Sequence, residues 1–159
     1  MKRYTTLIFD LGNVLIDYSP YSIVSSFTND VPTIQSLVRE IFLMQEWLDL
    51  DQGIITLDDA TKSIIARLDP SLHALALQIL DRWYDHLTER PYFLDLIKAL
   101  KAQGYRLVLF SNAALCFHEY QDRIQALRYF DHKIISADLK LSKPDLEFYR
   151  VACAIGEID

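Results

Sequence analysis

The sequence has few cysteines and no long apolar run, and both shortages narrow the class of protein. Only Cys116 and Cys153 are present among 159 residues, and their spacing fits neither a metal site nor a disulfide framework. No stretch approaches the roughly 18 apolar residues that a membrane-spanning helix needs. Asp10 also interrupts the apolar run behind Met1–Arg3 too early for a signal peptide. We therefore expect a cytoplasmic protein with no membrane partner.

Positive charge is scarce as well. The chain has 16 Lys and Arg against 22 Asp and Glu, a formal net charge of -6. Surfaces that bind nucleic acids need clustered Lys and Arg to neutralise phosphates, and the sequence has no such cluster, so we expect no nucleic-acid partner. The four histidines lack the HxxxH or HxH spacing of metal sites. What remains is an ordinary globular composition, 51% hydrophobic and 24% charged.

Three short apolar runs predict the strands of a parallel sheet. They are Leu7–Phe9, Arg106–Phe110 and Lys133–Ser136, and helical segments lie between them. Continuous apolar runs suit strands that are buried on both faces, and alternation with helices indicates right-handed βαβ units. Residues 18–88 instead show only helical periodicity, which is clearest from Ile34 to Ile41. The sequence therefore predicts an α/β fold whose sheet core is interrupted by a helical bundle.

Polar residues follow the predicted strands at the edge of the sheet where ligands usually bind. Asp10 ends the first strand, Ser111 and Asn112 end the second, and Lys143 lies beyond the third. Each alone has an ordinary reading as a helix cap, a turn residue or a surface lysine. Together they suit phosphoryl transfer: a carboxylate can attack phosphorus, while a hydroxyl, backbone N–H groups and an ammonium hold the phosphoryl oxygens.

The motifs that contain these residues resemble a known family. Phe9–Leu15 (FDLGNVL), Leu109–Asn112 (LFSN) and Ser142–Asp145 (SKPD) resemble the first three motifs of the haloacid dehalogenase-like (HAD-like) hydrolase superfamily. The resemblance covers essentially the whole chain, and the first motif is similar to that of sugar-phosphate phosphatases, glucose-1-phosphate phosphatase among them.

The resemblance implies a domain organisation. It implies a Rossmann-like core formed by residues 1–17 and 89–159, with a helical cap domain at residues 18–88. Specificity would then lie in cap residues that face the site, and Tyr18, Tyr21 and Trp47 are candidates.

The resemblance also implies an activity and a role for each site residue. Asp10 would be the nucleophile and a Mg²⁺ ligand, and the backbone carbonyl of Gly12 a second ligand. Ser111 and the backbone of Asn112 would bind the phosphoryl group, and Lys143 would complete that site. The implied activity is Mg²⁺-dependent hydrolysis of a small phosphomonoester, of the sugar-phosphate type, through an aspartyl-phosphate intermediate.

Two departures from the family pattern matter. Gly12 stands where most phosphatases of the family have a second aspartate that transfers a proton, so water or a residue such as Asp17 would have to replace it. The acidic fourth motif would lie beyond Asp159, so we expect residues 1–159 to be an incomplete version of the fold, with Leu7–Phe9 at a sheet edge. We expect this chain to bind Mg²⁺ weakly, and a chain longer by about 40 residues, one more strand–helix–strand stretch, to bind it well.

Two other functions remain open at this point. A haloacid dehalogenase uses the same aspartate to attack carbon, needs no metal and tolerates the loss of the second aspartate. A catalytically inactive fragment that acts as an interaction module would fit the missing fourth motif. The physiological substrate and the oligomeric state are open too.

Overall fold

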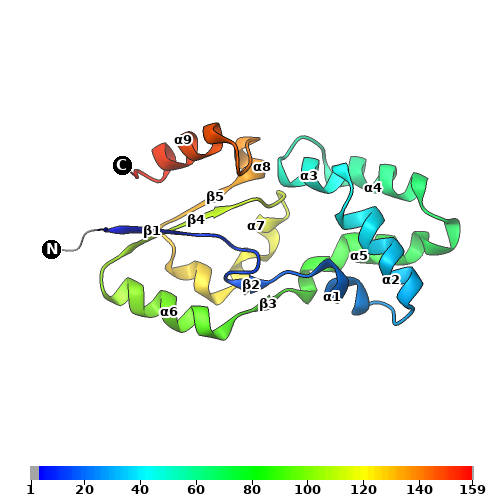
Figure 1. The fold of residues 1–159 in the computed structure, drawn as a ribbon, viewed down its shortest axis with the longest axis horizontal. Coiled ribbons are helices and arrows are strands. Elements are labelled where there is room, and N and C mark those ends of the chain that lie inside the picture. Colours follow the sequence, from blue (N-terminus) through cyan, green and yellow to red (C-terminus); the bar gives the residue numbers. More distant parts are fainter. Residues whose placement is uncertain (1–3, 159) are drawn as a thin grey trace. The chain divides into compact units, whose positions relative to one another are not determined.

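The computed structural model describes residues 4–158, so Met1–Arg3 and Asp159 lie outside everything that follows. The chain forms two compact units. One, here called the sheet unit, contains the residues up to Asp17, Asp51–Gly53 and the residues from Glu89 on. The other, the helical unit, contains Tyr18–Leu50 and Ile54–Thr88. The ribbon in Figure 1 shows strands and helices in the first and helices in the second, which confirms the predicted α/β class.

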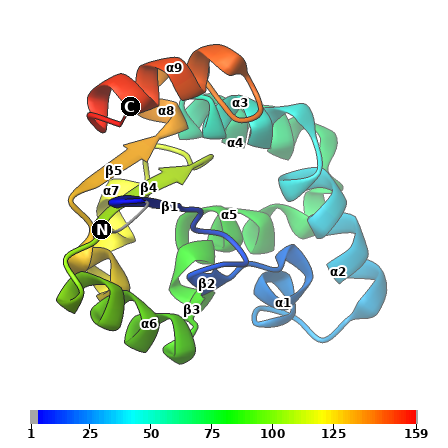
Figure 2. The ribbon, with the colours of Figure 1, turned by 60° about the vertical axis from the view of Figure 1, so that its left-hand side comes forward.

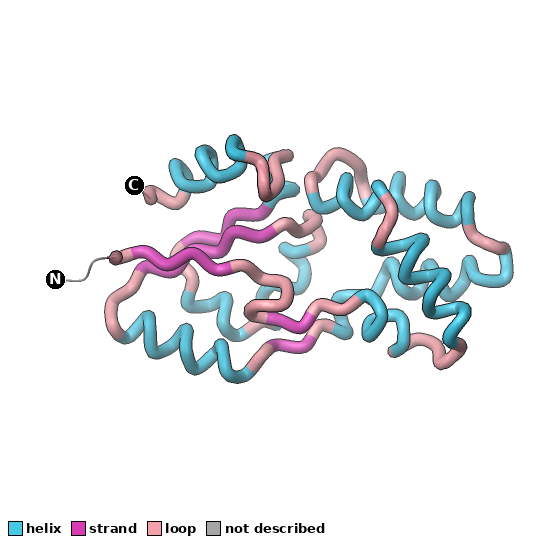
Figure 3. The backbone as a smooth tube through the Cα atoms, in the orientation of Figure 1, coloured by secondary structure: helices cyan, strands magenta, loops and turns pink. Residues whose placement is uncertain are grey.

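The sheet has three parallel strands in the described part of the chain. They are β1 (Thr6–Phe9), β4 (Arg106–Ser111) and β5 (His132–Ile135), in the order β1-β4-β5. Figure 3 shows them side by side, and both pairings are parallel. The register pairs Phe9 with Leu109 and Ser111 with Ile135. The three predicted strands are therefore confirmed to within a residue or two.

The order of the strands explains their different burial. Central β4 is buried from Leu107 through Ser111, as its apolar sequence predicts. Strand β1 lies at an edge of the described sheet, where the side chain of Ile8 is 48% exposed. The expected edge position of Leu7–Phe9 agrees with this order.

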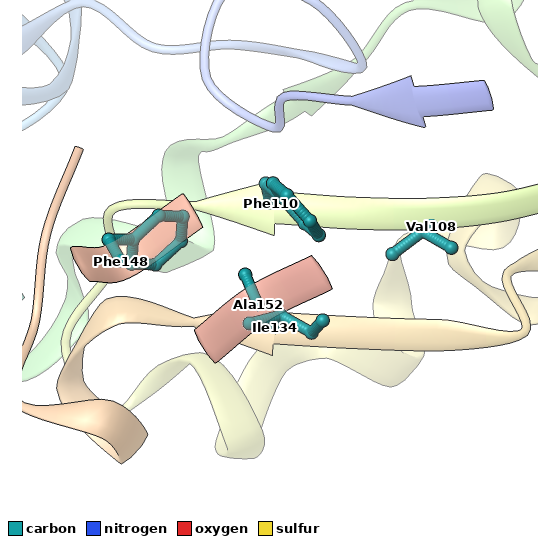
Figure 4. Packing of buried hydrophobic residues seen from close by; sticks show 5 residues of the cluster. All are labelled: Val108, Phe110, Ile134, Phe148 and Ala152. Carbon is teal, nitrogen blue, oxygen red and sulfur yellow. The ribbon is translucent and has the colours of Figure 1, made fainter. Parts of the chain in front are cut away.

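Helices cover both faces of the sheet. Helix α9 (Leu146–Ile155) packs through Phe148 and Ala152 against side chains of β4 and β5. Figure 4 shows these residues converging: Val108, Phe110, Ile134, Phe148 and Ala152. Helix α6 (Pro91–Ala102) lies on the opposite side of the sheet in both views (Figures 1 and 2). Because side chains alternate along a strand, Leu107 and Leu109 of β4 point away from the α9 face.

The boundaries of α6 follow from its sequence. Pro91 occupies the first turn, where a missing N–H costs nothing, and Gly104 follows the end of the helix with a φ of 76°. The remaining elements that lie wholly or partly in the sheet unit are shorter. They are β2 (Ile16–Asp17), β3 (Thr88–Glu89), α7 (Phe117–Tyr120), η4 (Gln121–Arg123), η5 (Gln125–Tyr129) and α8 (Ser136–Leu139). The β2–β3 pair was not predicted, because two residues are too few to show a strand pattern.

The helical unit is a bundle with an aromatic core. Its elements are α1 (Pro20–Ser25), α2 (Val31–Leu37), the π-helical turn η1 (Val38–Phe42), α3 (Gln45–Asp51), α4 (Leu57–Arg67), η2 (Pro70–Leu72), α5 (His73–Arg82) and η3 (Trp83–His86). The ring centroids of Phe42 and Trp47 are 4.5 Å apart, and those of Trp47 and Trp83 5.2 Å apart. Trp47, one of the candidate specificity residues, packs in this core and is only 7% exposed.

Polar side chains set the helix starts of this unit. Thr56 caps α4, because the Asp59 N–H donates to its hydroxyl and that hydroxyl donates to the Asp59 carboxylate at 2.6 Å. The Thr56 hydroxyl thus satisfies an N–H of the first turn and also holds the Asp59 carboxylate, so Asp59 has a structural role there. Within residues 4–158, no helix has both the length and the apolar character needed to cross a bilayer.

Candidate active site

The structure brings together the acid and the ammonium that the sequence singles out. Asp10 follows the last residue of β1, and Lys143 lies in the segment between α8 and α9. The Asp10 Oδ2 and Lys143 Nζ atoms are 2.9 Å apart. The other carboxylate oxygen, Oδ1, accepts a hydrogen bond of 2.8 Å from the backbone N–H of Leu11. Both oxygens of Asp10 are therefore oriented by neighbouring donors at the carboxyl edge of the sheet.

The Lys143 ammonium is anchored by the strand beside β1. It donates to the carbonyl oxygen of Phe110, near the end of β4, at 2.9 Å. An ammonium has three N–H donors, and the carboxylate of Asp10 and this carbonyl engage two of them. Among the described residues this leaves one N–H donor to meet an anionic substrate.

Asn112 takes part through its side chain. Its amide Nδ2 donates to the Lys143 carbonyl at 2.9 Å, and its Oδ1 accepts from the Lys143 N–H at 2.9 Å. This two-point contact fixes the segment that carries Lys143 against the loop that follows β4. The sequence assigned Asn112 only a backbone role, and its side-chain role was missed because the partner lies 31 residues away.

Ser111 lies at the end of β4 and is nearly fully buried, with 2% of its surface exposed. Leu109, two residues earlier on β4, pairs with Phe9, the residue directly before Asp10. Its hydroxyl donates only a long hydrogen bond of 3.4 Å to the carbonyl of Asn112. A hydroxyl held this weakly is free to turn toward a ligand at the carboxyl edge.

The turn after Asp10 does not need glycine at position 12. The residue with the left-handed backbone is Asn13, whose φ is 58°, and Gly12 is not among the described residues with positive φ. Gly12 forms an isolated bridge with Ile16, and the Asn13 N–H donates to the Ile16 carbonyl at 2.8 Å. The backbone at Gly12 is therefore compatible with a side chain.

Asp17, the acid considered as a substitute proton donor, is engaged elsewhere. Its carboxylate accepts a hydrogen bond of 2.6 Å from Arg90 Nε, and the same guanidinium donates to the Asn13 carbonyl at 2.7 Å. Arg90 thus stabilises the turn that follows β1. No sequence pattern singled out Arg90, since a lone arginine before a proline is not distinctive.

The residues present provide a minimal set of oxygen ligands for Mg²⁺. Asp10 would supply a carboxylate and the backbone of Gly12 a carbonyl, the two ligands expected from the sequence. No group of three or more His, Cys, Asp or Glu side chains with metal-binding geometry occurs within residues 4–158. Mg²⁺ commonly keeps several waters and is shared between one or two carboxylates and a substrate phosphate. The donor set thus fits a metal held jointly with a phosphorylated substrate.

Comparison with known proteins identifies the family. The model of the haloacid dehalogenase-like hydrolases matches residues 4–155. The chain belongs to the haloacid dehalogenase-like hydrolase family. It is 29% identical over 162 residues to an (S)-2-haloacid dehalogenase of Pseudomonas putida, covering 96% of this chain and 70% of the relative. An (S)-2-haloacid dehalogenase of Pseudomonas fluorescens is 28% identical, with the same coverage.

Solved structures of other HAD-like hydrolases share the fold. A HAD family enzyme from Bacteroides thetaiotaomicron, in complex with magnesium and inorganic phosphate, superposes with a TM-score of 0.72 at 21% identity, covering 98% of this chain and 80% of that one. The L-2-haloacid dehalogenase of Xanthobacter autotrophicus, with chloropropionic acid covalently bound, gives a TM-score of 0.65 at 17% identity and covers 98% and 66%. At these identities the likeness concerns the fold alone.

Proposed function

We propose that this HAD-like hydrolase cleaves small phosphomonoesters, of the sugar-phosphate type, through a covalent intermediate on Asp10. The observation that carries the proposal is the 2.9 Å contact between Asp10 and Lys143 at the carboxyl edge of the sheet. It joins a nucleophilic carboxylate to a cation that can hold the substrate's anionic group. The Ser111 hydroxyl at the end of the adjacent strand is a second donor for that group.

The chemistry follows from these groups. A carboxylate oxygen of Asp10 attacks phosphorus, the bond from phosphorus to the ester oxygen breaks, and the leaving oxygen takes a proton from water to depart as the alcohol. Water then attacks the phosphorus of the acyl phosphate, which releases orthophosphate and restores the carboxylate. Lys143, Ser111 and the backbone of Asn112 hold the phosphoryl oxygens as charge shifts among them. A Mg²⁺ ion, when bound by Asp10 and the Gly12 carbonyl, supplies further positive charge toward the phosphoryl oxygens.

Haloacid dehalogenation is the second candidate, and the curated relatives favour it. Two relatives at 28–29% identity carry that name. In that reaction Asp10 attacks the carbon that bears the halogen, halide leaves, and water hydrolyses the ester. No acid at position 12 is required, which suits Gly12. Lys143 and Ser111 would then hold the substrate's carboxylate in place of a phosphoryl group.

One pair of assays separates these two functions. We expect the purified chain to hydrolyse p-nitrophenyl phosphate and sugar phosphates, and to do so faster with Mg²⁺ than with a chelator. Chloride release from (S)-2-chloropropionate without metal, together with no phosphatase activity, would replace this proposal with dehalogenation. Absence of both activities would favour the inactive module.

Lys143→Met tests the proposed anion site. Methionine keeps an unbranched apolar side chain that is one atom shorter, but it removes the charge that contacts Asp10 and the Phe110 carbonyl. We expect the inhibition constant of orthophosphate to rise by about tenfold or more, since a hydrogen bond to a charged group contributes about 1.5–3 kcal/mol. Inhibition assays on Lys143→Met and on Lys140→Met, an exposed lysine nearby, would measure it. Equal inhibition of both variants and the wild type would remove Lys143 from the site.

Gly12→Asp tests whether a missing proton donor limits turnover. The backbone there accepts a side chain, because the left-handed residue of the turn is Asn13. General acid–base catalysis contributes about 100-fold or more, so we expect breakdown of the phosphoenzyme to accelerate by at least about tenfold. Rapid-quench measurement of phosphoenzyme decay reports this step directly. A folded Gly12→Asp variant with unchanged decay would show that another group already transfers the proton.

A further inference from the structure

A stretch remote in sequence from the candidate site is seated in the sheet unit beside it. Asp51 is the last residue of α3, and it belongs to the sheet unit together with the next two residues, through Gly53. Ser136, directly after β5, donates a hydrogen bond from its hydroxyl to the Asp51 carbonyl. Gly53 has a φ of 69°, and a Cβ there would clash with the carbonyl oxygen of Ala137. Only glycine meets both demands without strain, so the stretch is held closely at this point.

The Asp51 side chain contacts the loop that follows β4. The backbone N–H of Ala114 donates a hydrogen bond to its carboxyl group. The preceding N–H, that of Ala113, donates to the Ser136 hydroxyl at 2.9 Å, and Ser136 is fully buried. Two consecutive amides are therefore held by one small network. They come directly after Ser111 and Asn112, so the network determines how the end of this loop is fixed.

We propose that Asp51 is a positioning residue of the candidate active site, because its carboxyl group fixes the loop that presents Ser111 and Asn112. The catalytic part of this inference rests on the proposed function, whereas the contact between Asp51 and Ala114 does not. A loop fixed at Ala113 and Ala114 holds the donors of Ser111 and Asn112 in one arrangement before substrate arrives, which reduces the cost of binding.

The protonation of Asp51 gives this contact a pH dependence. Burial raises the pKa of the Asp51 carboxyl from 3.8 to about 7, against the opposing effect of the Ala114 hydrogen bond. Below that pH the neutral carboxyl remains in place at little cost. Above it, the carboxylate carries a charge where solvation is poor, which weakens the packing of Asp51–Gly53 against the sheet unit.

Few charged groups face Asp51 in the described structure. Burial raises the pKa of the Cys116 thiol to about 12, with smaller contributions from Glu119 and Asp51, so the thiol stays neutral near pH 7. On α8, Asp138 pairs with His118 at 2.9 Å. His118 lies on α7, which follows the same loop, so it is the residue to separate from Asp51 by substitution.

Backbone amide resonances test the positioning without reference to activity. We expect the Ala114 and Asn112 ¹H–¹⁵N resonances of the wild type to shift with a midpoint near pH 7. In Asp51→Asn, which keeps an oxygen acceptor and cannot ionise there, the shift should vanish. It should persist in His118→Gln, the matched control. If the pH-dependent shift of these resonances disappeared in His118→Gln but persisted in Asp51→Asn, the proposal would be overturned.

Kinetics on a phosphomonoester test the functional consequence. We expect Asp51→Ala to lower kcat/KM by about tenfold at pH 6, the loss expected for one hydrogen bond to the loop, and Asp51→Asn to recover it to within about twofold. Wild-type kcat/KM should decline above pH 7, while that of Asp51→Asn should not. Equal kcat/KM for all three proteins at each pH would overturn the positioning role. If the wild type lacks phosphatase activity, the proposed function fails and the amide titration alone decides the positioning.

Discussion

Asp10→Asn is expected to abolish hydrolysis while leaving the fold intact. The amide has the size of the carboxylate but is not a nucleophile, so no covalent intermediate can form. We expect kcat to fall by at least about 1,000-fold, which corresponds to about 4 kcal/mol of transition-state stabilisation. The rate of product formation from the active substrate, measured at saturating substrate concentration for the variant and the wild type, would show this fall in kcat.

Stability should change little in the same variant. The Asp10 side chain is 46% exposed, and an ion pair as accessible as that with Lys143 contributes at most about 1 kcal/mol. Asp95→Asn, at an exposed position on α6, is the matched control and should retain wild-type kcat. An Asp10→Asn protein with wild-type turnover would show that the chemistry does not depend on this carboxylate.

Asp51→Asn is expected to stabilise the protein above neutral pH. The pKa of Asp51 is about 7 in the folded protein, against 3.8 for a solvated aspartate. Between these values the folded state binds more protons than the unfolded state, so this residue lowers stability as pH rises from about 4 to about 7. The loss is complete above pH 7. Asparagine is uncharged at every pH, so the variant does not undergo this loss of stability.

The size of this effect follows from the pKa difference. At about 1.4 kcal/mol per pKa unit, we expect Asp51→Asn to raise the free energy of unfolding at pH 8 by roughly 2–4 kcal/mol. Near pH 4 the variant and the wild type should agree within about 0.5 kcal/mol. Urea denaturation across this range would measure both, and the other titrating groups cancel in the difference. A difference that does not change with pH would contradict the buried-carboxyl account of Asp51.

The local features of the sheet unit could be predicted because they depend on short stretches of sequence. An apolar run that ends at an acid places Asp10 at the end of β1, whatever surrounds it. The central strand β4 is apolar throughout, and the ends of α6 follow from Pro91 and Gly104. Parallel pairing then requires the carboxyl ends of the strands to share one edge, which made the meeting of Asp10 and Lys143 predictable.

The contacts that fix the site were decided only by the tertiary structure. The Asn112 amide clamps the backbone of Lys143 across 31 residues, and the hydroxyl of Ser136 reaches Asp51 across 85. No periodicity of the sequence indicates which two residues pair in this way, because partners so far apart in the chain meet only when the fold brings them together. Asp51 in particular follows a helical pattern that indicates nothing more than a solvated acid. Its raised pKa exists because packing removes its carboxyl from solvent, which is a property of the folded chain and not of its local sequence.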